Sequence, residues 1–310
     1  MMLKELIIEL SHNCNLHCKM CGFWQDGFDK RKFMDFGLFK RIIDELGSSA
    51  GAIRLNGRGE STIHPHFLEM LDYCRKAHPK VEINLFTNIS FKKDRILERF
   101  ILDDIQLFIS MDSPVKAELE EIRAGCDYDN LIQNIHGLSK CRKRPFIIFT
   151  IQEENLHRLK EIGEFALNNK MGIIYNTVRR DEGIQELLKM IGRDKKRIIS
   201  DIEGIRELYR PSGLQCLIPA QIGGIALGLP RTVVDITYGQ KERCPALESE
   251  LCILYNGDVT PCNMFNPFVF GNIVKDGIDG TLNGPMRKKF IETHKSHYYC
   301  SNCACLGGTA

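Results

Sequence analysis

Three cysteines near the amino terminus are the first residues whose type and spacing indicate chemistry. Cys14, Cys18 and Cys21 lie in the stretch SHNCNLHCKMCGFW, with three and then two residues between them. A structural zinc site needs four ligands, and His17 is a poor fourth because it adjoins Cys18 and adjacent side chains point apart. Three thiolates can instead hold a [4Fe–4S] cluster that keeps one iron free for another ligand. The alternative is a set of buried structural thiols.

The thirteen cysteines of the chain are placed unevenly. Three lie in the first 21 residues, six lie in the last 67, and four are scattered singly between them. The opening MMLKELIIEL is interrupted by Glu5 and Glu9 and lacks the apolar core of a secretory signal. In a reducing compartment disulfides are rare, and clustered thiols indicate metal binding or catalysis. The pattern therefore predicts two sites at opposite ends of the chain.

Alternating apolar runs and amphipathic segments surround the first cysteine group. The predicted strands are 5–10, 52–56, 81–87, 105–110, 145–151 and 172–178, and the predicted helices between them are 36–46, 66–77, 128–138 and 155–169. This alternation predicts an α/β fold, a partial (β/α)6 TIM-like barrel with a parallel sheet. The working face of such a barrel lies at the carboxyl ends of its strands. The three cysteines follow the first strand, so we expect them at the barrel mouth.

The sequence changes character twice after the barrel. We expect residues 1–180 to form the barrel and residues 181–243 to form a linker of charged, exposed helices and a connector that contains Pro and Gly. Residues 244–310 hold six cysteines and few helix signals. They are expected to form a small C-terminal domain that contains a β-hairpin.

Composition and charge exclude several classes of protein. Of the 310 residues, 43% are hydrophobic and 26% are charged, as in ordinary globular proteins. A net charge of +2 gives no electrostatic reason to expect a nucleic-acid partner. No stretch has the length and apolarity of a membrane span. We therefore expect a cytoplasmic protein without a nucleic-acid or membrane partner.

The CNLHCKMC motif resembles that of the radical S-adenosylmethionine (radical SAM) superfamily. The resemblance covers nearly the whole chain and implies that the free iron binds S-adenosylmethionine (SAM). One electron from the cluster then cleaves SAM to methionine and a 5′-deoxyadenosyl radical, which abstracts hydrogen from the substrate. The electron would come from a reduced flavodoxin or ferredoxin. The residue before the third cysteine is usually aromatic and touches the adenine, whereas here it is Met20.

A glycine-rich segment after the second predicted strand also resembles the superfamily. NGRGESTIHP (56–65) is similar to its Gly-Gly-Glu segment. The resemblance implies that Gly57 and Gly59 let the backbone approach SAM and that Glu60 accepts the methionine ammonium. Alone, such a segment is equally well explained as a turn.

Two further strand ends carry matching polar residues. FTNIS (86–90) resembles the superfamily's Thr-Asn segment and includes Asn88, and ISMDSP (109–114) resembles its Ser-x-Asp segment. The second match implies that Ser110 and Asp112 lie near the ribose or the substrate. Polar residues also end strands and cap helices for structural reasons, so the order of the matches along the chain carries the argument.

The last 67 residues resemble the SPASM/Twitch extension of radical SAM enzymes, which holds an auxiliary cluster. The resemblance implies that a second [4Fe–4S] cluster is bound by Cys244, Cys262, Cys300 and Cys303. Four ligands fit one closed cluster, and only Cys252 and Cys305 remain there. Sequence spacing leaves a tetrahedral zinc site with four cysteines as the alternative.

The resemblance implies a reaction class but leaves the substrate open. The first hypothesis is hydrogen abstraction that oxidises (dehydrogenates) or epimerises a sugar or aminocyclitol. The alternative substrate is a ribosomal peptide precursor. We see no peptide-binding extension before the first strand, which favours a small molecule. A hypothesis from another class is a non-catalytic metal-binding protein.

Specific side chains are candidates for contact with the substrate. In an epimerase a thiol returns a hydrogen atom to the substrate radical, and Cys252 and Cys216 are the candidates for this role. Side chains expected at the barrel mouth, and therefore near the substrate, are Arg54, Gln152, Asn176 and Arg179.

Overall fold

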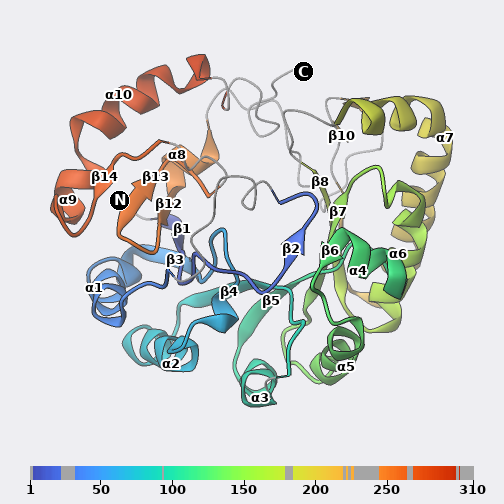
Figure 1. The fold of residues 1–310 in the computed structure, drawn as a ribbon, viewed down its shortest axis with the longest axis horizontal. Coiled ribbons are helices and arrows are strands. Elements are labelled where there is room, and N and C mark those ends of the chain that lie inside the picture. The colour runs from blue at the N-terminus through green and yellow to red at the C-terminus, as the bar shows by residue number, and fades with distance from the viewer. Residues whose placement is uncertain are drawn as a thin grey trace.

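The structure is a sheet curved into an incomplete barrel with helices on its outer side. This computed structural model describes residues 3–21, 32–92, 94–178, 184–218, 221–222, 225–226, 244–263, 268–297 and 300. Ten strands form one sheet in the order β14-β13-β12-β1-β3-β4-β5-β7-β8-β9. Figure 1 shows α1, α2, α3, α5, α6 and α7 along the outside of this sheet.

The six predicted barrel strands are confirmed, each within two residues of its expected ends. The strands of the large sheet are β1 (Leu3–Ile8), β3 (Ala50–Arg54), β4 (Glu82–Thr87), β5 (Ile105–Ser110), β7 (Phe146–Ile151), β8 (Gly172–Thr177), β9 (Cys216–Leu217), β12 (Glu250–Ile253), β13 (Asp258–Thr260) and β14 (Gly271–Asn272). Pairing is parallel from β12 to β9 and antiparallel between β12, β13 and β14. Two small sheets pair β2 (His17–Cys18) with β6 (Arg123–Ala124) and β10 (Gln221–Ile222) with β11 (Ile225–Ala226).

Helices α1 to α7 connect successive parallel strands, and α8, α9 and α10 belong to the C-terminal segment. The helices are α1 (Phe36–Leu46), α2 (Phe67–Ala77), α3 (Asp94–Leu102), α4 (Lys116–Ile122), α5 (Tyr128–Leu138), α6 (Leu159–Asn168), α7 (Ile184–Tyr209), α8 (Pro245–Ser249), α9 (Gly277–Leu282) and α10 (Pro285–Thr293). The four predicted helices are present as α1, α2, α5 and α6, whereas α3 and α4 are additional. Among the described helices none is long and apolar enough to span a membrane.

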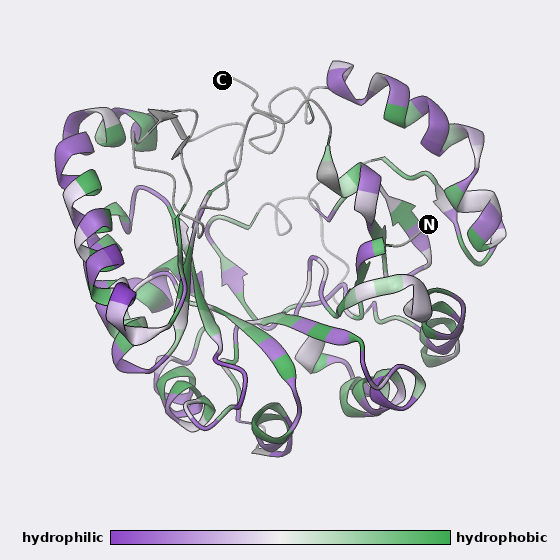
Figure 2. Cartoon of the chain, turned by 180° about the vertical axis from the view of Figure 1, so that it is seen from behind, coloured by the Kyte–Doolittle hydropathy of each residue, from purple (hydrophilic) through white to green (hydrophobic). Residues whose placement is uncertain are grey.

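Local sequence explains where the outer helices begin and which side they bury. Asp35 caps α1 by accepting a hydrogen bond from the Leu38 amide at 3.0 Å, and Asp127 caps α5 in the same way. The buried residues of α1 include Phe39, Ile42 and Leu46, which recur at helical spacing. Figure 2 shows the same division on the other outer helices, with hydrophobic residues toward the sheet and hydrophilic residues toward solvent.

Helix α7 corrects the expectation of exposed linker helices. Residues 184–209 form one helix of 26 residues that packs on α6, and β9 then pairs in parallel with β8. The helix buries a stripe that includes Ile191, Ile198, Ile202 and Ile205, each fully buried. Its charged residues misled the sequence analysis, because they cover only the outer face of a helix that extends the barrel.

The predicted β-hairpin is present, and it continues the barrel sheet. Strands β12 and β13 are joined by a turn in which Gly257 has a φ of 86°, a conformation that favours glycine. Residues 250–253 of β12 pair in parallel with residues 5–8 of β1. The C-terminal segment therefore covers the β1 edge of the barrel. The domain boundaries at residues 180 and 243 stay predictions.

The buried stripe of α7 yields a stability prediction. Ile202→Ala should lower the free energy of unfolding by about 2–5 kcal/mol, because it leaves a cavity between α7 and the barrel. Leu208→Ala, on the same helix with its side chain 42% exposed, should change it by less than about 0.5 kcal/mol. Urea unfolding of the cluster-free chain followed by circular dichroism measures both. Equal small effects would mean that α7 is a linker after all.

Candidate functional site

The cysteine loop crosses the concave side of the barrel after β1. Figure 1 shows β2 on the inner side of the curved sheet. Strand β2 pairs with β6, so that Cys18 lies opposite Arg123, and the Lys19 amide bonds the Ile122 carbonyl at 2.9 Å. The Cys21 amide bonds the Cys18 carbonyl at 3.0 Å. The segment after α4 therefore holds the loop in place at the barrel mouth, as the sequence predicts.

The three thiols of this loop are half-buried neighbours. The pKa of Cys14 is raised to about 12, chiefly by burial, with the charge of Glu60 and the nearby Cys18 and Cys21 acting in the same direction. Burial also raises the pKa of Cys18, and Cys21 adds to the shift. Three thiolates crowded in this way need positive charge beside them, which the irons of a cluster supply. The residues present therefore fit the group that the motif implies.

Within the described ranges, no three His, Cys, Asp or Glu side chains are grouped so that they could hold a metal ion. A [4Fe–4S] cluster binds each thiolate at a different iron, so its ligands need not meet at one point. The Leu16 amide donates a hydrogen bond to Cys14 Sγ at 3.4 Å. Such bonds to the sulfurs help to set the potential of a cluster.

Glu60 is buried beneath the mouth and joins two strand ends. It precedes a 3₁₀ turn, η3 (Ser61–Ile63). Its Oε1 accepts bonds from the amide (3.2 Å) and hydroxyl (2.8 Å) of Thr62 and from the hydroxyl of Thr87 (2.9 Å), and its Oε2 accepts the Asn88 amide (2.9 Å). Burial raises the pKa of the carboxyl, while these donors oppose the shift. The predicted bond to the methionine ammonium stays a prediction, because four protein donors already occupy this carboxylate.

Gly57 and Gly59 are needed for contacts within the chain itself. A Cβ on Gly57 would lie 2.4 Å from the Cβ of Glu9, and a Cβ on Gly59 would lie 2.3 Å from the Ser11 carbonyl and 2.4 Å from that of Asn13. All three distances are far below van der Waals contact. The loop after β3 therefore packs directly on the cysteine loop. The expected approach of these glycines to SAM stays a prediction.

The end of β4 is strained and is also tied to the cysteine loop. Ile89 has a φ of 39°, an uncommon conformation for a β-branched residue. Its carbonyl accepts a bond from Asn134 Nδ2 at 2.7 Å. The side chain of Asn88 donates to Asn15 Oδ1 at 3.0 Å and accepts from the Ser90 amide at 2.9 Å. Strain of this kind tends to concentrate at functional sites.

The two polar residues after β5 lie in different environments. Ser110 is half-buried, whereas Asp112 is fully buried. Oδ2 of Asp112 lies 2.7 Å from Arg123 Nε, and Oδ1 accepts the Thr150 amide at 2.7 Å. This geometry gives Asp112 a structural role, and the expected contact of Ser110 and Asp112 with the ribose or substrate stays a prediction.

Arg123 and Glu9 contribute to the site, although the sequence analysis did not single them out. Arg123 Nη1 donates to Cys18 Sγ at 3.7 Å. Burial lowers the pKa of this guanidinium, but Asp112 and Cys18 outweigh it and raise the pKa overall. For Glu9, the signal was available in the sequence, since it is a charged residue at the end of an apolar strand that precedes the cysteine motif.

Glu9 links the cysteine loop to the C-terminal hairpin. Its Oε1 lies 2.9 Å from His12 Nδ1, and its Oε2 accepts the Arg58 amide at 2.9 Å. Burial alone would raise the pKa of Glu9, but His12 and Arg58 outweigh it and lower the pKa. The His12 ring contacts the ring of Tyr255 in the hairpin turn, with centroids 4.9 Å apart. The Glu9 amide also bonds the Ile253 carbonyl at 2.9 Å.

The predicted auxiliary ligands lie at the ends of C-terminal elements. Cys244 precedes α8, Cys262 follows β13, and both are half-buried, as is Cys300. The Cys300 amide bonds the His297 carbonyl at 3.0 Å. The His297 ring stacks on the buried Phe290 with centroids 4.7 Å apart, so a small aromatic core positions Cys300. Cys303 lies outside the described residues.

The two candidate hydrogen donors lie on opposite faces of the sheet. Cys252 belongs to a small buried cluster with Ile7 and Leu254 on the concave face, and burial raises its thiol pKa to about 12. It stays a candidate. Cys216 instead lies next to Tyr175 and Tyr209, whose hydroxyls bond α6 backbone carbonyls. The prediction for Cys216 is not supported, because its thiol faces the helices and not the barrel interior.

The remaining candidates occupy varied positions. Met20 is half-buried beside the third cysteine, and Asn176 is half-buried at the end of β8. Arg54 is already paired with Glu5 inside the barrel. Gln152 is buried, and its Nε2 has no hydrogen-bond partner in the described part of the chain. Arg179 lies outside the described residues.

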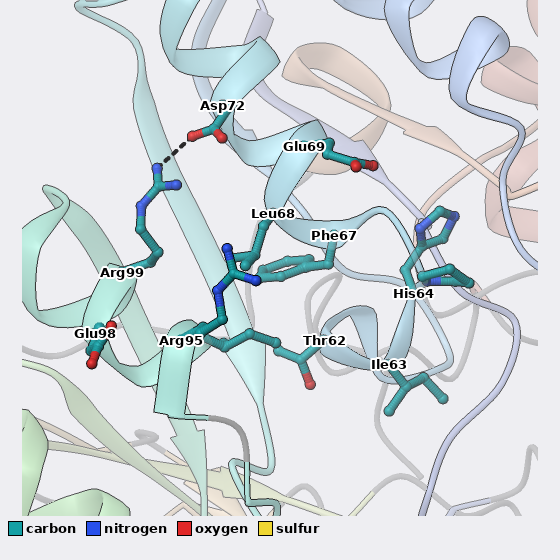
Figure 3. Close-up of a pocket in the computed structure, with 12 residues that line it drawn as sticks. Thr62, Ile63, His64, Phe67, Leu68, Glu69, Asp72, Arg95, Glu98 and Arg99 are labelled. Carbon is teal, nitrogen blue, oxygen red and sulfur yellow. Dashed lines mark ion pairs between the residues drawn. The ribbon is translucent and has the colours of Figure 1, made fainter.

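A separate surface hollow of about 590 Å³ lies between α2 and α3. Its lining includes Thr62, Phe67, Arg95 and Arg99, and none of the predicted site residues. Figure 3 shows the ion pair that Arg99 forms across it with Asp72, at 2.6 Å. The hollow is on the outer side of the barrel and is separate from the cysteine loop.

A partial parallel barrel with three thiols after its first strand and a cysteine-bearing C-terminal hairpin defines a radical SAM enzyme. Residues 8–166 match the radical SAM superfamily, and residues 244–304 match SPASM, an iron–sulfur cluster-binding domain. The chain belongs to this superfamily and carries a SPASM domain. Its cofactors are [4Fe–4S] clusters and SAM. When bound, the cluster and SAM supply the 5′-deoxyadenosyl radical that this class uses.

Two curated relatives align with almost the whole chain. One is the tungsten-containing aldehyde ferredoxin oxidoreductase cofactor-modifying protein of Pyrococcus furiosus, 23% identical over 97% of this chain and 87% of its own length. The other is the antilisterial bacteriocin subtilosin biosynthesis protein AlbA of Bacillus subtilis, also 23% identical, over 96% of this chain and 66% of its own length.

A solved structure has a similar fold. Streptococcus suis SuiB bound to its precursor peptide SuiA superposes with a TM-score of 0.69 at 17% identity, over 98% of this chain and 70% of SuiB. At this identity the likeness concerns the fold.

The close packing at Gly59 predicts a selective loss of the first cluster. Gly59→Ala should force the loop after β3 away from Ser11 and Asn13 and so displace the cysteine loop. We expect about four fewer irons per chain after anaerobic reconstitution and loss of 5′-deoxyadenosine formation. Gly192→Ala, in α7 with nothing within 4 Å of its added Cβ, should keep full iron. Full iron in both variants would contradict the packing argument.

Glu60→Gln tests whether this carboxylate anchors the loops around it, as observed, or acts only on the methionine ammonium of SAM, as the resemblance implies. The substitution places an amide nitrogen in the carboxylate position and leaves a buried donor without an acceptor, which should cost about 1–3 kcal/mol. The thermal midpoint of SAM-free protein should therefore fall. If Glu60 acts only on the SAM ammonium, the midpoint stays unchanged and only SAM affinity falls. Differential scanning calorimetry and equilibrium dialysis with SAM measure the two effects.

Proposed function

We propose that this radical SAM enzyme modifies a peptide by abstracting hydrogen from one of its carbon atoms. The observation that carries this proposal is the similarity, over 96% of the chain, to a protein of bacteriocin biosynthesis. The fold likeness to a peptide-bound enzyme agrees with it. The peptide takes precedence over the sugar or aminocyclitol that the sequence analysis put first, since the similarity to AlbA favours the peptide.

The concave face supports a peptide side chain as the target. Phe86, Phe108 and Phe146 lie on three adjacent strands in register and are half-buried. Their rings stack, with centroids 4.4 Å apart for the first pair and 5.6 Å for the second. Residues on the alternate positions, such as Leu107, are buried against the helices. This row of rings therefore offers an apolar surface inside the barrel.

Polar groups on the barrel suit a peptide backbone. Gln152 follows β7 at the mouth, and its Nε2 is a buried donor without a described partner. Buried donors are normally satisfied, so a carbonyl oxygen of a bound substrate is a fitting acceptor. Arg54 stacks over the Phe86 ring at 5.0 Å and closes one end of the row.

A second candidate function follows from the Pyrococcus relative. Its alignment covers 97% of this chain and 87% of its own length, and its name describes cofactor modification. A cofactor of an oxidoreductase is therefore the alternative substrate. Oxidation, cross-linking and epimerisation are all open outcomes of hydrogen abstraction, and the flavodoxin or ferredoxin donor stays a prediction.

The proposal predicts that peptides stimulate SAM cleavage. The reconstituted protein is incubated with dithionite, SAM and a pool of synthetic peptides with varied central residues, and 5′-deoxyadenosine is measured against a substrate-free control. We expect at least about a tenfold increase, since bound substrate consumes the radical and commits the reaction. Stimulation by an aminosugar pool or by a tungsten-enzyme cofactor, with none by peptides, would contradict the proposal.

Mass spectrometry of the product in heavy water separates the reaction types. Loss of two hydrogens indicates oxidation or cross-linking, whereas gain of one deuterium indicates epimerisation. In the second case Cys252→Ala should abolish deuterium incorporation, because its protonated thiol is the candidate donor. Cys216→Ala is the matched control, a buried thiol on the helix side, and should incorporate deuterium as the wild type does. Equal incorporation in both variants would exclude Cys252 as the donor.

A further inference from the structure

A buried guanidinium lies against one ligand of the first cluster. Arg123 is 8% exposed, and its Nη1 donates to Cys18 Sγ at 3.7 Å. The contact follows from backbone pairing, since β6 places Arg123 directly opposite Cys18 in the β2–β6 ladder. It joins residues 105 positions apart in the sequence. An arginine guanidinium stays protonated in proteins, so the charge beside this sulfur is permanent.

Asp112 fixes the orientation of this guanidinium. Its Oδ2 lies 2.7 Å from Arg123 Nε, and its Oδ1 is held by the Thr150 amide at 2.7 Å. Asp112 is fully buried, so solvent screens the pair little. The Cys126 thiol also lies near the guanidinium. Arg123 thus has one side toward an anchored carboxylate and the other toward the cluster ligand.

The position of this charge bears on electron transfer to the cluster. Reduction adds one negative charge to a cluster already coordinated by thiolates. A fixed positive charge near a ligand sulfur stabilises the reduced form, and both charge and hydrogen bonds to the sulfurs set cluster potentials. Asp112 carries the opposite charge, but Arg123 is the group that contacts the sulfur. The positive charge of Arg123 should therefore raise the reduction potential of the cluster, and the negative charge of Asp112 should make this rise smaller.

We propose that Arg123 is a positioning residue that raises the reduction potential of the SAM-binding cluster through Cys18, and that Asp112 limits the effect. The inference rests on the radical SAM class of the chain and is independent of its substrate. It places Asp112 in the cluster environment, and the expected contact of Asp112 with the ribose or substrate stays a prediction.

The test is a redox titration of the full-length reconstituted protein without SAM, followed by electron paramagnetic resonance. A variant with Cys14, Cys18 and Cys21 replaced by Ala provides the auxiliary-cluster signal for subtraction. Arg123→Gln should make reduction of the first cluster about tenfold less favourable, which is 59 mV lower for one electron. Arg123→Lys keeps the charge and should stay within about threefold of wild type. Asp112→Asn should shift the equilibrium in the opposite direction, toward reduction.

Arg99→Gln is the matched control. Like Arg123, Arg99 on α3 forms ion pairs, in this case with Asp72 at 2.6 Å and Asp103 at 2.7 Å. Its replacement should leave the potential of the first cluster unchanged. Shifts of the same sign in Arg123→Gln and Asp112→Asn, or no shift in either at full iron content, would overturn the proposal. If Arg123→Gln does not retain the cluster, the Asp112→Asn variant alone tests the proposal. An unchanged or lower potential of the first cluster in Asp112→Asn would then overturn the proposal.

Discussion

The buried carboxylate of Glu60 is the interaction on which the barrel mouth depends. Four donors from Thr62, Thr87 and Asn88 converge on it, and the Glu60 amide bonds the Asn13 carbonyl at 2.8 Å. Loops after β1, β3 and β4 thus meet at one residue. A buried carboxylate is costly unless its oxygens are satisfied, so each donor keeps its loop in place. The cysteine loop has a defined position because its neighbours have this shared anchor.

Much of the fold could be predicted because buried parallel strands leave a strong local signal. Most barrel strands are short runs rich in Ile, Leu or Phe, and pairing in the sheet follows from the alternation with helices. The same applies to the three cysteines, whose spacing is itself the signal. The stripe of isoleucines in α7, from Ile191 to Ile205, was also readable at helical period, but the many charges on its other face obscured it.

The parts that could not be predicted depend on contacts between distant residues. Arg123 meets Cys18 only because β6 pairs with β2, and Glu9 meets Arg58 only because β1 adjoins β3. Local sequence contains no information about such partners. Local sequence also does not show which face of the sheet Cys252 and Cys216 occupy, since both are small apolar residues in short strands. Only the strand pairing decides that Cys252 faces the barrel interior and Cys216 faces the helices.

The parallel pairing of β12 with β1 has a consequence for biosynthesis. The first strand of the barrel has β3 on one side, but its other edge is covered by residues 250–253. While the ribosome is still producing the intervening 240 or so residues, that edge stays open, and long-range strand pairing of this kind is slow. The nascent chain therefore keeps an unprotected β-edge next to Cys14, Cys18 and Cys21. We expect that iron loading follows release from the ribosome, when both ends of the polypeptide are available to close the scaffold.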